Sequence, residues 1–179
     1  MTNQEILMAA IRAIPDFPKP GILFRDITTL IADPPAFEIA VNMMVEAARE
    51  AGVQKIVAIE SRGFIFGAPM AVAMKLPLVI VRKPGKLPGK VVRESYALEY
   101  GTDTLEIHED AVSPDDCVAV VDDLLATGGT AAAVGSLLTK LKARVGLYLF
   151  AVELTGLAGT ARLLEKIPHA KVVSLVSYE

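Results

Sequence analysis

The sequence predicts an α/β fold with a mostly parallel central sheet flanked by helices. Short apolar runs with little polar alternation are typical of strands buried on both faces, and helical patterns between them indicate parallel strands joined by crossover helices. The apolar runs are residues 56–59, 78–81, 118–121, 147–152 and 172–176, and the helical patterns lie at about 64–75, 129–142 and 158–166.

The N-terminal segment carries its own start and stop signals. Thr2 and Glu5 have the spacing of a capping box, and apolar residues then recur at helical intervals as far as Pro15, where we expect the first helix to end. Three prolines within residues 15–21 exclude helix and central strand. We expect a shaped loop there and call the proline-rich segment 15–27 the hood.

The next helix has a clear beginning. Asp33 precedes two prolines and a face of apolar residues that continues to Gly52. An N-cap aspartate with proline in the first turn is a typical helix start. We therefore expect an amphipathic helix from about 34 to 51.

Composition limits the class of protein. With 179 residues, a net charge of −3 and 53% apolar residues, we expect one domain over 1–179, with the first helix and hood in 1–32. No apolar run reaches the roughly 18 residues that cross a bilayer, and no secretion signal is evident, so we expect a cytoplasmic protein. The single Cys117 and the distant His108 and His169 argue against a disulfide or a histidine-rich metal site, and the acidic balance argues against nucleic acid.

One long segment departs from the strand and helix pattern. Residues 84–102 contain two Pro-Gly elements and little periodicity, which predicts a long flexible loop of the kind that forms lids. Within residues 82–93 there are five Lys or Arg and no acid. Besides a ligand-binding role, this basic run could be a solvated loop or an RNA contact. The lack of aromatic residues between the charges argues against RNA.

Polar residues follow three of the predicted strands. Ligands of open α/β sheets bind beyond the carboxyl ends of the strands, and the segments Glu60–Gly63, Arg82–Lys86 and Asp122–Thr130 all lie there. Thr127–Thr130 opens a helix with two glycines, so its backbone N–H groups and helix dipole predict a cradle for a phosphate group. The lysine of a P-loop and the GxGxxG of a dinucleotide fold are both absent. A plain glycine turn is the alternative.

The aspartates upstream favour the phosphate cradle. A carboxylate such as Asp122 or Asp123 can accept both hydroxyls of a vicinal diol, and a second one can hold hydrated Mg²⁺. We expect exposed carboxylates at the strand end, with one of them facing the ligand because successive strand residues point to opposite sides. The other is expected to cap local backbone.

The signature at 120–130 resembles the phosphoribosyl diphosphate (PRPP) motif of the type I phosphoribosyltransferases. Blocks at 17–27, 60–64, 82–88 and 98–101 are similar to those of the adenine branch, in the same order. The resemblance implies purine salvage by Mg²⁺-dependent transfer of the 5-phosphoribosyl group from PRPP to adenine, giving AMP and pyrophosphate. A phosphoribosyltransferase for hypoxanthine, guanine or xanthine and a non-catalytic PRPP-binding regulator stay as alternatives, although a DNA-binding module is not evident.

The resemblance also implies roles for particular residues. Arg62, Asp122 and Asp123 would act in catalysis with Glu99 as the acid near the purine, and Mg²⁺ would be held mainly by PRPP, through water to one aspartate. A cis non-proline peptide often occurs in the family's pyrophosphate loop, and the basic run can reach a neighbouring subunit, which implies a homodimer. The residues expected to bind PRPP or AMP are Ser61, Arg62, Gly63, Arg82, Lys83, Lys86, Tyr100, Asp122, Asp123, Ala126, Thr127, Gly128, Gly129 and Thr130.

The hood is expected to recognise the base. Phe24 can stack on a flat purine, backbone groups of Leu23 and Arg25 can read its 6-amino edge, and Leu157 can close the other face. Ordinary core packing is the alternative for Phe24. Because the reaction builds positive charge on the sugar that water would trap, a closing lid is also needed, and residues 84–102 are the candidate.

Overall fold

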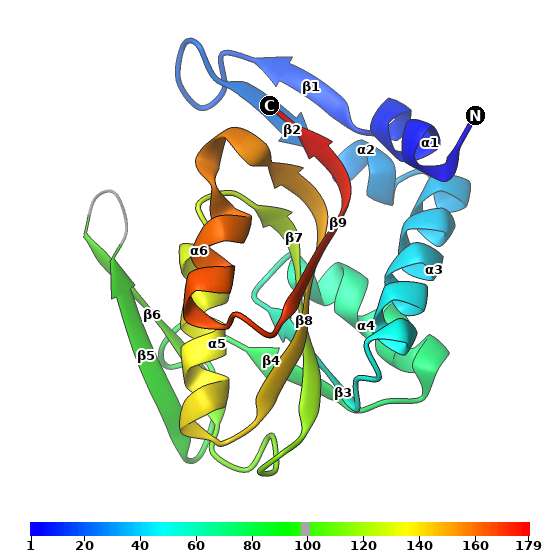
Figure 1. Ribbon diagram of the computed structural model, residues 1–179. Helices are drawn as coiled ribbons and strands as arrows, with labels where there is room; N and C mark the ends of the chain where they lie inside the picture. The colour runs from blue at the N-terminus through cyan, green and yellow to red at the C-terminus, as the bar shows by residue number, and fades with distance from the viewer. Residues whose placement is uncertain (98–100) are drawn as a thin grey trace.

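The central sheet confirms the predicted fold class. The computed structural model describes residues 1–97 and 101–179 (Figure 1). Within these residues, parallel strands form one five-stranded sheet in the order β4-β3-β7-β8-β9. The strands are β3 (Lys55–Ile59), β4 (Leu78–Val81), β7 (Cys117–Leu125), β8 (Arg144–Leu154) and β9 (Lys171–Tyr178).

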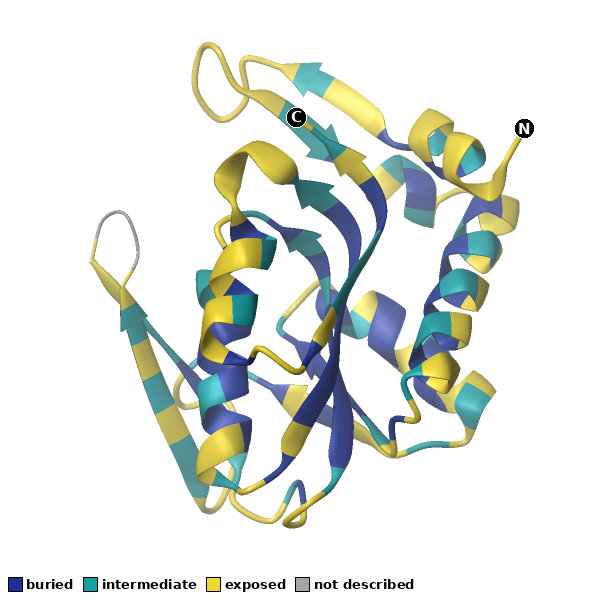
Figure 2. Ribbon diagram, viewed as in Figure 1, coloured by how far each residue is buried: buried dark blue, intermediate teal, exposed yellow. Residues whose placement is uncertain are grey.

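Helices cover both faces of the sheet and bury its strands (Figures 1 and 2). Ala119 and Val121 of β7 belong to the core under one group of helices, whereas Val118 and Val120 belong to the core under the other. This alternation explains why the strand is apolar from Cys117 to Val121. The first group is α1 (Asn3–Ala10), α3 (Pro34–Glu50) and α4 (Gly63–Met74), and the second is α5 (Gly129–Lys140) and α6 (Gly159–Lys166).

Capping explains where the first helices begin. The Thr2 hydroxyl oxygen accepts a hydrogen bond of 3.2 Å from the backbone N–H of Glu5, whose carboxylate accepts one of 2.7 Å from Thr2 N–H. Asp33 accepts a hydrogen bond of 3.3 Å from the backbone N–H of Ala36 at the start of α3. Both predicted N-termini are confirmed. The helices of the described residues include none that is long and apolar enough to cross a membrane.

The first helix is shorter than predicted. It ends at Ala10, and β1 (Arg12–Pro15) pairs with β2 (Leu23–Asp26) in an antiparallel hairpin. Ile14 lies opposite Phe24 in this pairing, although its spacing suits a helix. An ion pair between Arg12 and Asp26 connects the two strands. The strand pairing therefore outweighs the helical spacing of the apolar residues in this segment. The hairpin lies above the carboxyl ends of β8 and β9 in Figure 1.

The segment predicted as a long loop at 84–102 is in large part a hairpin. β5 (Val91–Ala97) pairs antiparallel with β6 (Thr102–His108), and this β5–β6 hairpin packs beside α5. Residues of β5 alternate between exposed and half-buried positions, as in a strand. The two faces differ little in hydrophobicity, so the sequence pattern of this strand is weak. An isolated bridge between Arg82 and Glu106 joins the hairpin to the end of β4. The short helix α2 (Thr28–Ile31) and the 3₁₀ turn η1 (Thr155–Leu157) complete the connections.

The contact between α5 and β8 yields a stability prediction. A Cβ at Gly135 would lie 2.1 Å from the Tyr148 hydroxyl oxygen and 2.8 Å from Ile167 Cδ1. Gly135→Ala is expected to lower the free energy of unfolding by about 1–3 kcal/mol, because overpacking exceeds the helix propensity that alanine adds. Urea denaturation measures the change. Gly156→Ala is the control, since its Cβ would meet nothing within 4 Å, and equal stability of the two variants would contradict the packing argument.

Candidate active site

A polar cavity of about 330 Å³ lies at the carboxyl ends of β3, β4 and β7. It brings together residues from all three of the polar segments that follow the predicted strands, and it adds residues of the β5–β6 hairpin. A smaller hollow of about 80 Å³ shares the lining residues Asp122 and Thr130 with this cavity. The rest of its lining lies within residues 124–131. The larger cavity is lined by Glu60, Ser61, Arg62, Lys83, Tyr96, Asp103, Leu105, Asp122, Asp123 and Thr130.

The smaller hollow has the geometry of a phosphate cradle. Gly128 has φ +78° and directly precedes α5, and a Cβ there would lie 2.9 Å from the Gly159 carbonyl oxygen. Glycine is therefore required both by the left-handed backbone and by the close approach. The turn offers the first backbone N–H groups of a twelve-residue helix to the hollow. Such a helix start favours an anion.

Asp122 and Asp123 both line the larger cavity, whereas the sequence predicts that one faces the ligand. They are also less exposed than predicted, because β7 continues to Leu125 and pairs Asp122 with Phe150 of β8. Asp123 is 6% exposed and its Oδ2 lies 2.6 Å from Nε of Arg62. Asp122 Oδ1 accepts a hydrogen bond of 2.9 Å from the backbone N–H of Asp123, which is the expected backbone contact.

Charge is distributed unevenly over this aspartate pair. Burial raises the pKa of Asp122 well above its usual range, and the neighbouring Asp123 carboxylate raises it further. Arg62 opposes the shift only in part. A hydrogen bond donated by a ligand hydroxyl, or a nearby metal ion, would favour the charged form of Asp122.

Glu60 holds the cationic loop that follows β4. Its carboxylate forms ion pairs with Lys86 and, at 3.3 Å, with Arg82, and it accepts a hydrogen bond of 2.8 Å from the backbone N–H of Lys83. Burial favours a higher pKa for Glu60, but the hydrogen bonds from Lys86, Lys83 and Arg82 prevail and lower it to about 2. Sequence reasoning missed this role, although Glu60 directly precedes Ser61 at a strand end.

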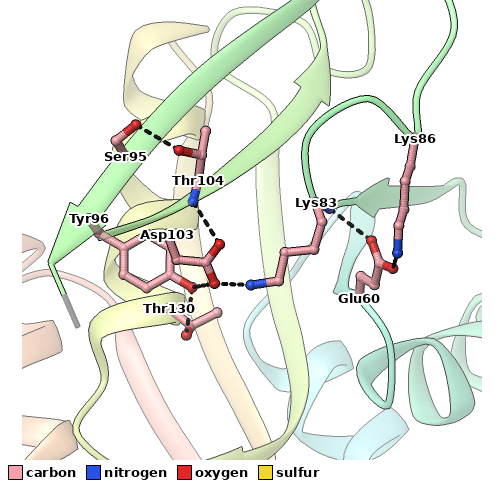
Figure 3. A network of polar contacts seen from close by, with 8 residues as sticks. All are labelled: Glu60, Lys83, Lys86, Ser95, Tyr96, Asp103, Thr104 and Thr130. Atoms are coloured by element: carbon pink, nitrogen blue, oxygen red, sulfur yellow. Dashed lines mark hydrogen bonds and ion pairs between the residues drawn. The ribbon is translucent and has the colours of Figure 1, made fainter. Parts of the chain in front are cut away.

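A second network crosses the cavity (Figure 3). Lys83 forms an ion pair with Asp103 of β6, and the Tyr96 hydroxyl donates a hydrogen bond of 3.2 Å to the same carboxylate oxygen. The Tyr96 oxygen also lies 3.2 Å from Oγ1 of Thr130 in the first turn of α5. The sequence analysis did not single out Asp103, because no motif marks it and only the fold of the β5–β6 hairpin brings it to Lys83.

The peptide between Glu60 and Ser61 is cis, as the resemblance implies. Ser61 and Arg62 line the cavity and Gly63 is the first residue of α4. The predicted pyrophosphate loop therefore lies at the cavity, directly between β3 and the N-terminus of α4.

The predicted base-binding residues lie apart from the cavity lining. Phe24 is half-buried and makes an edge-to-face contact with Phe17, with ring centroids 5.1 Å apart. The guanidinium carbon of Arg25 lies 3.8 Å above the Tyr178 ring at the end of β9. The Tyr178 carbonyl oxygen accepts a hydrogen bond from Thr155, in the same 3₁₀ turn as Leu157.

These contacts bring the hood and η1 together around Tyr178, a residue that the sequence analysis missed. Leu23 and Leu157 remain exposed, at 49% and 48%. Apolar side chains are thus available beside the strand ends. Glu99, the predicted acid, and Tyr100, predicted to bind PRPP or AMP, lie outside the described residues.

Comparison with known proteins places this site in a family. The model of the phosphoribosyl transferase domain family matches residues 28–177. The adenine phosphoribosyltransferase of Aeromonas salmonicida is 55% identical over 172 residues, which cover 96% of this chain and 94% of the relative. The chain belongs to the adenine phosphoribosyltransferase family. The smaller hollow, the paired aspartates and the cationic loop all lie within the residues that the family model matches.

Solved structures agree with the family and the architecture. The adenine phosphoribosyltransferase of Thermoanaerobacter pseudethanolicus superposes with a TM-score of 0.89 at 46% identity, covering 99% of this chain and 100% of that one. The Saccharomyces cerevisiae enzyme, with adenine and an iminoaltritol bisphosphate bound, has a TM-score of 0.88 at 38% identity, with coverages of 97% and 98%. The hood and the β5–β6 hairpin are therefore included in the region of likeness.

The low pKa of Glu60 gives a pH prediction for this family member. Its pKa falls from the usual 4.5 to about 2 on folding, so the ion pairs stabilise the fold fully above pH 4.5 and lose this effect as pH falls toward 2. Glu60→Gln should lower the free energy of unfolding at pH 7 on the order of 1–2 kcal/mol.

The difference between wild type and Glu60→Gln should shrink as pH falls, and urea denaturation across pH measures it. Glu94→Gln, which removes the ion pair with Lys140 outside the cavity, is the matched control. A constant difference between wild type and Glu60→Gln at all pH values would contradict the assignment.

Proposed function

We propose that this chain transfers the 5-phosphoribosyl group of PRPP to adenine and releases AMP and pyrophosphate, as a purine-salvage enzyme. The observation that carries the proposal is the placement of two carboxyl groups, Asp122 and Asp123, between a phosphate-type hollow and a cluster of cations. That order matches a molecule with a monophosphate at one end, a ribose diol in the middle and a diphosphate at the other end.

The binding roles follow the same order. The 5′-phosphate would bind the N–H groups and hydroxyls at Ala126, Thr127, Gly128, Gly129 and Thr130, and the ribose hydroxyls would bind Asp122 and Asp123. The diphosphate would bind Arg62, the backbone of Ser61 and Gly63, and the cations Arg82, Lys83 and Lys86. Fixed cations stabilise the charge that develops on the departing pyrophosphate, so Arg62 would act in catalysis as well as binding.

Charge balance supports a requirement for Mg²⁺. Among the described residues, the cavity lining has four carboxyl groups and two cationic side chains, which disfavours a bare polyanion. The described residues contain no group of three or more His, Cys, Asp or Glu arranged to hold a metal ion. This donor set fits an ion held mainly by PRPP, with Asp122 or Asp123 reaching it through water. When bound, Mg²⁺ would neutralise charge on the leaving diphosphate.

Adenine would bind between the hood and η1. Phe24 offers a ring face, Leu157 an exposed apolar side chain, and the backbone of Leu23 and Arg25 offers polar groups for the 6-amino edge. The link through Tyr178 holds both segments at the end of β9, near the strand ends where the sugar would lie. An oxopurine would reverse the hydrogen-bonding pattern at position 6 and leave groups of the hood unpaired.

Catalysis also requires water to be excluded from the sugar. The β5–β6 hairpin reaches the cavity through Tyr96 and Asp103, which supports a lid role for the segment 84–102. Within this segment, Glu99 would act as the acid near the purine and Tyr100 as a gate. We further propose that residues 1–179 form one domain, that the enzyme is a cytoplasmic homodimer, and that neither nucleic acid nor membrane is a partner.

Base choice is the first test of the activity. Pyrophosphate release from PRPP should occur with adenine, fall by at least about 100-fold with hypoxanthine or guanine, and stop when EDTA removes Mg²⁺. A coupled pyrophosphate assay measures all three. Release with an oxopurine instead would contradict the hood assignment, and no release with any base would favour a PRPP-binding regulator.

The aspartate pair is the second test. Replacing Asp122 and Asp123 together by Asn should lower turnover by at least about 100-fold, because the ribose hydroxyls lose both carboxylate acceptors. Circular dichroism checks that the variant is folded. Asp115→Asn, in the turn two residues before the same strand begins, is the control and should keep wild-type turnover. Wild-type turnover in the folded double variant would disprove the ribose-binding role.

A further inference from the structure

The groups expected to bind PRPP already have partners within the chain. Arg62 is paired with Asp123, Lys83 with Asp103, and the Thr130 hydroxyl lies within hydrogen-bond distance of Tyr96. An anion entering the cavity therefore competes with these partners for the same cations and hydroxyl. Such competition lowers the apparent affinity for the anion.

Asp103 differs from Asp123 in its position. Asp123 lies on a strand of the central sheet, whereas Asp103 lies on the β5–β6 hairpin, across the cavity from the strands. Its Oδ1 accepts a hydrogen bond of 2.8 Å from the Thr104 backbone N–H, and its Oδ2 contacts Tyr96 and Lys83 (Figure 3). Both oxygens are thus oriented, and the carboxylate is aimed at the Lys83 ammonium group.

The same network gives Thr130 a defined orientation. The phenol of Tyr96 has one proton, which the Asp103 carboxylate accepts, so the hydroxyl of Thr130 donates to Tyr96. In this arrangement Thr130 does not offer its proton to a phosphate. The Asp103 carboxylate thus contacts Lys83, which is proposed to bind the diphosphate. Through Tyr96 it also orients the hydroxyl of Thr130, which is proposed to bind the 5′-phosphate.

Both members of the ion pair are charged at neutral pH. Burial lowers the pKa of Lys83, but the hydrogen bond with Asp103 and nearby negative charges raise it overall. The hydrogen bond from Lys83 lowers the pKa of Asp103. Asp103 therefore places a full negative charge inside the cavity proposed to receive a polyanion.

We propose that Asp103 is an internal competitor of the diphosphate: it pairs with Lys83 and gives this cation up when PRPP binds. The inference rests on the proposed function, because it needs an anion in this cavity. Arrival of the diphosphate breaks the contacts that attach the hairpin to Lys83 and Thr130, and departure of pyrophosphate restores them. Asp103 is thus a positioning residue that acts through Lys83 and assists product release.

The test is the affinity for inorganic pyrophosphate with Mg²⁺, measured by calorimetry on the full chain. Asp103→Asn and Asp103→Ala should each bind pyrophosphate about tenfold more tightly than wild type, because the competing carboxylate is gone. Asp103→Glu keeps the charge and should bind like wild type. Thermal denaturation identifies any variant that does not fold. Unchanged or weaker binding by both neutral variants would overturn the proposal.

Two controls separate competition from other effects. Glu94→Gln removes an ion pair between the same hairpin and Lys140 of α5, so a similar gain there would show that a loosened hairpin, and not Asp103, is responsible. In a Lys83→Met background, Asp103→Asn should have no further effect. A persistent gain would indicate direct repulsion and overturn competition for Lys83. If wild type binds no pyrophosphate, the proposed function itself fails.

Discussion

Burial of the central sheet on both faces is the constraint on which the rest of the structure depends. The apolar strands leave no place for polar side chains along most of their length, as the fully buried run from Val118 to Val121 illustrates. Polar groups are therefore concentrated where the strands end. Because the strands are parallel, their carboxyl ends share one edge, and Ser61, Lys83 and Asp123 meet there from three different strands.

Charge balance is the second organising principle of the site. Glu60, Asp103 and Asp123 form ion pairs with Arg62, Arg82, Lys83 and Lys86 around the cavity. These pairs connect the loop after β4 and the N-terminus of α4 to neighbouring elements. Under the proposed function, an incoming anion would compete with these carboxylates for the cations.

Two hairpins outside the central sheet approach the strand ends from different sides. The β1–β2 hairpin approaches the end of β9 through the contact of Arg25 with Tyr178, on the side proposed for the base. The β5–β6 hairpin approaches from the side of α5 through Tyr96. The strand ends of the central sheet thus supply most of the cavity lining, and the β5–β6 hairpin supplies Tyr96, Asp103 and Leu105.

Local patterns in the sequence were sufficient for the individual strands of the sheet, the caps at Thr2 and Asp33, and the Gly128 turn, because each is set largely by residues close in the chain. Tertiary contacts decided the rest. Ile14 has helical spacing but pairs with Phe24 in a hairpin. The strand β5 has no clear alternation of apolar and polar residues, so its sequence did not predict it; it forms because it pairs with β6. Asp103 and Lys83 are twenty residues apart and carry no shared motif. Their ion pair exists only because the chain folds a hairpin back across the cavity, a long-range arrangement that residue spacing does not encode.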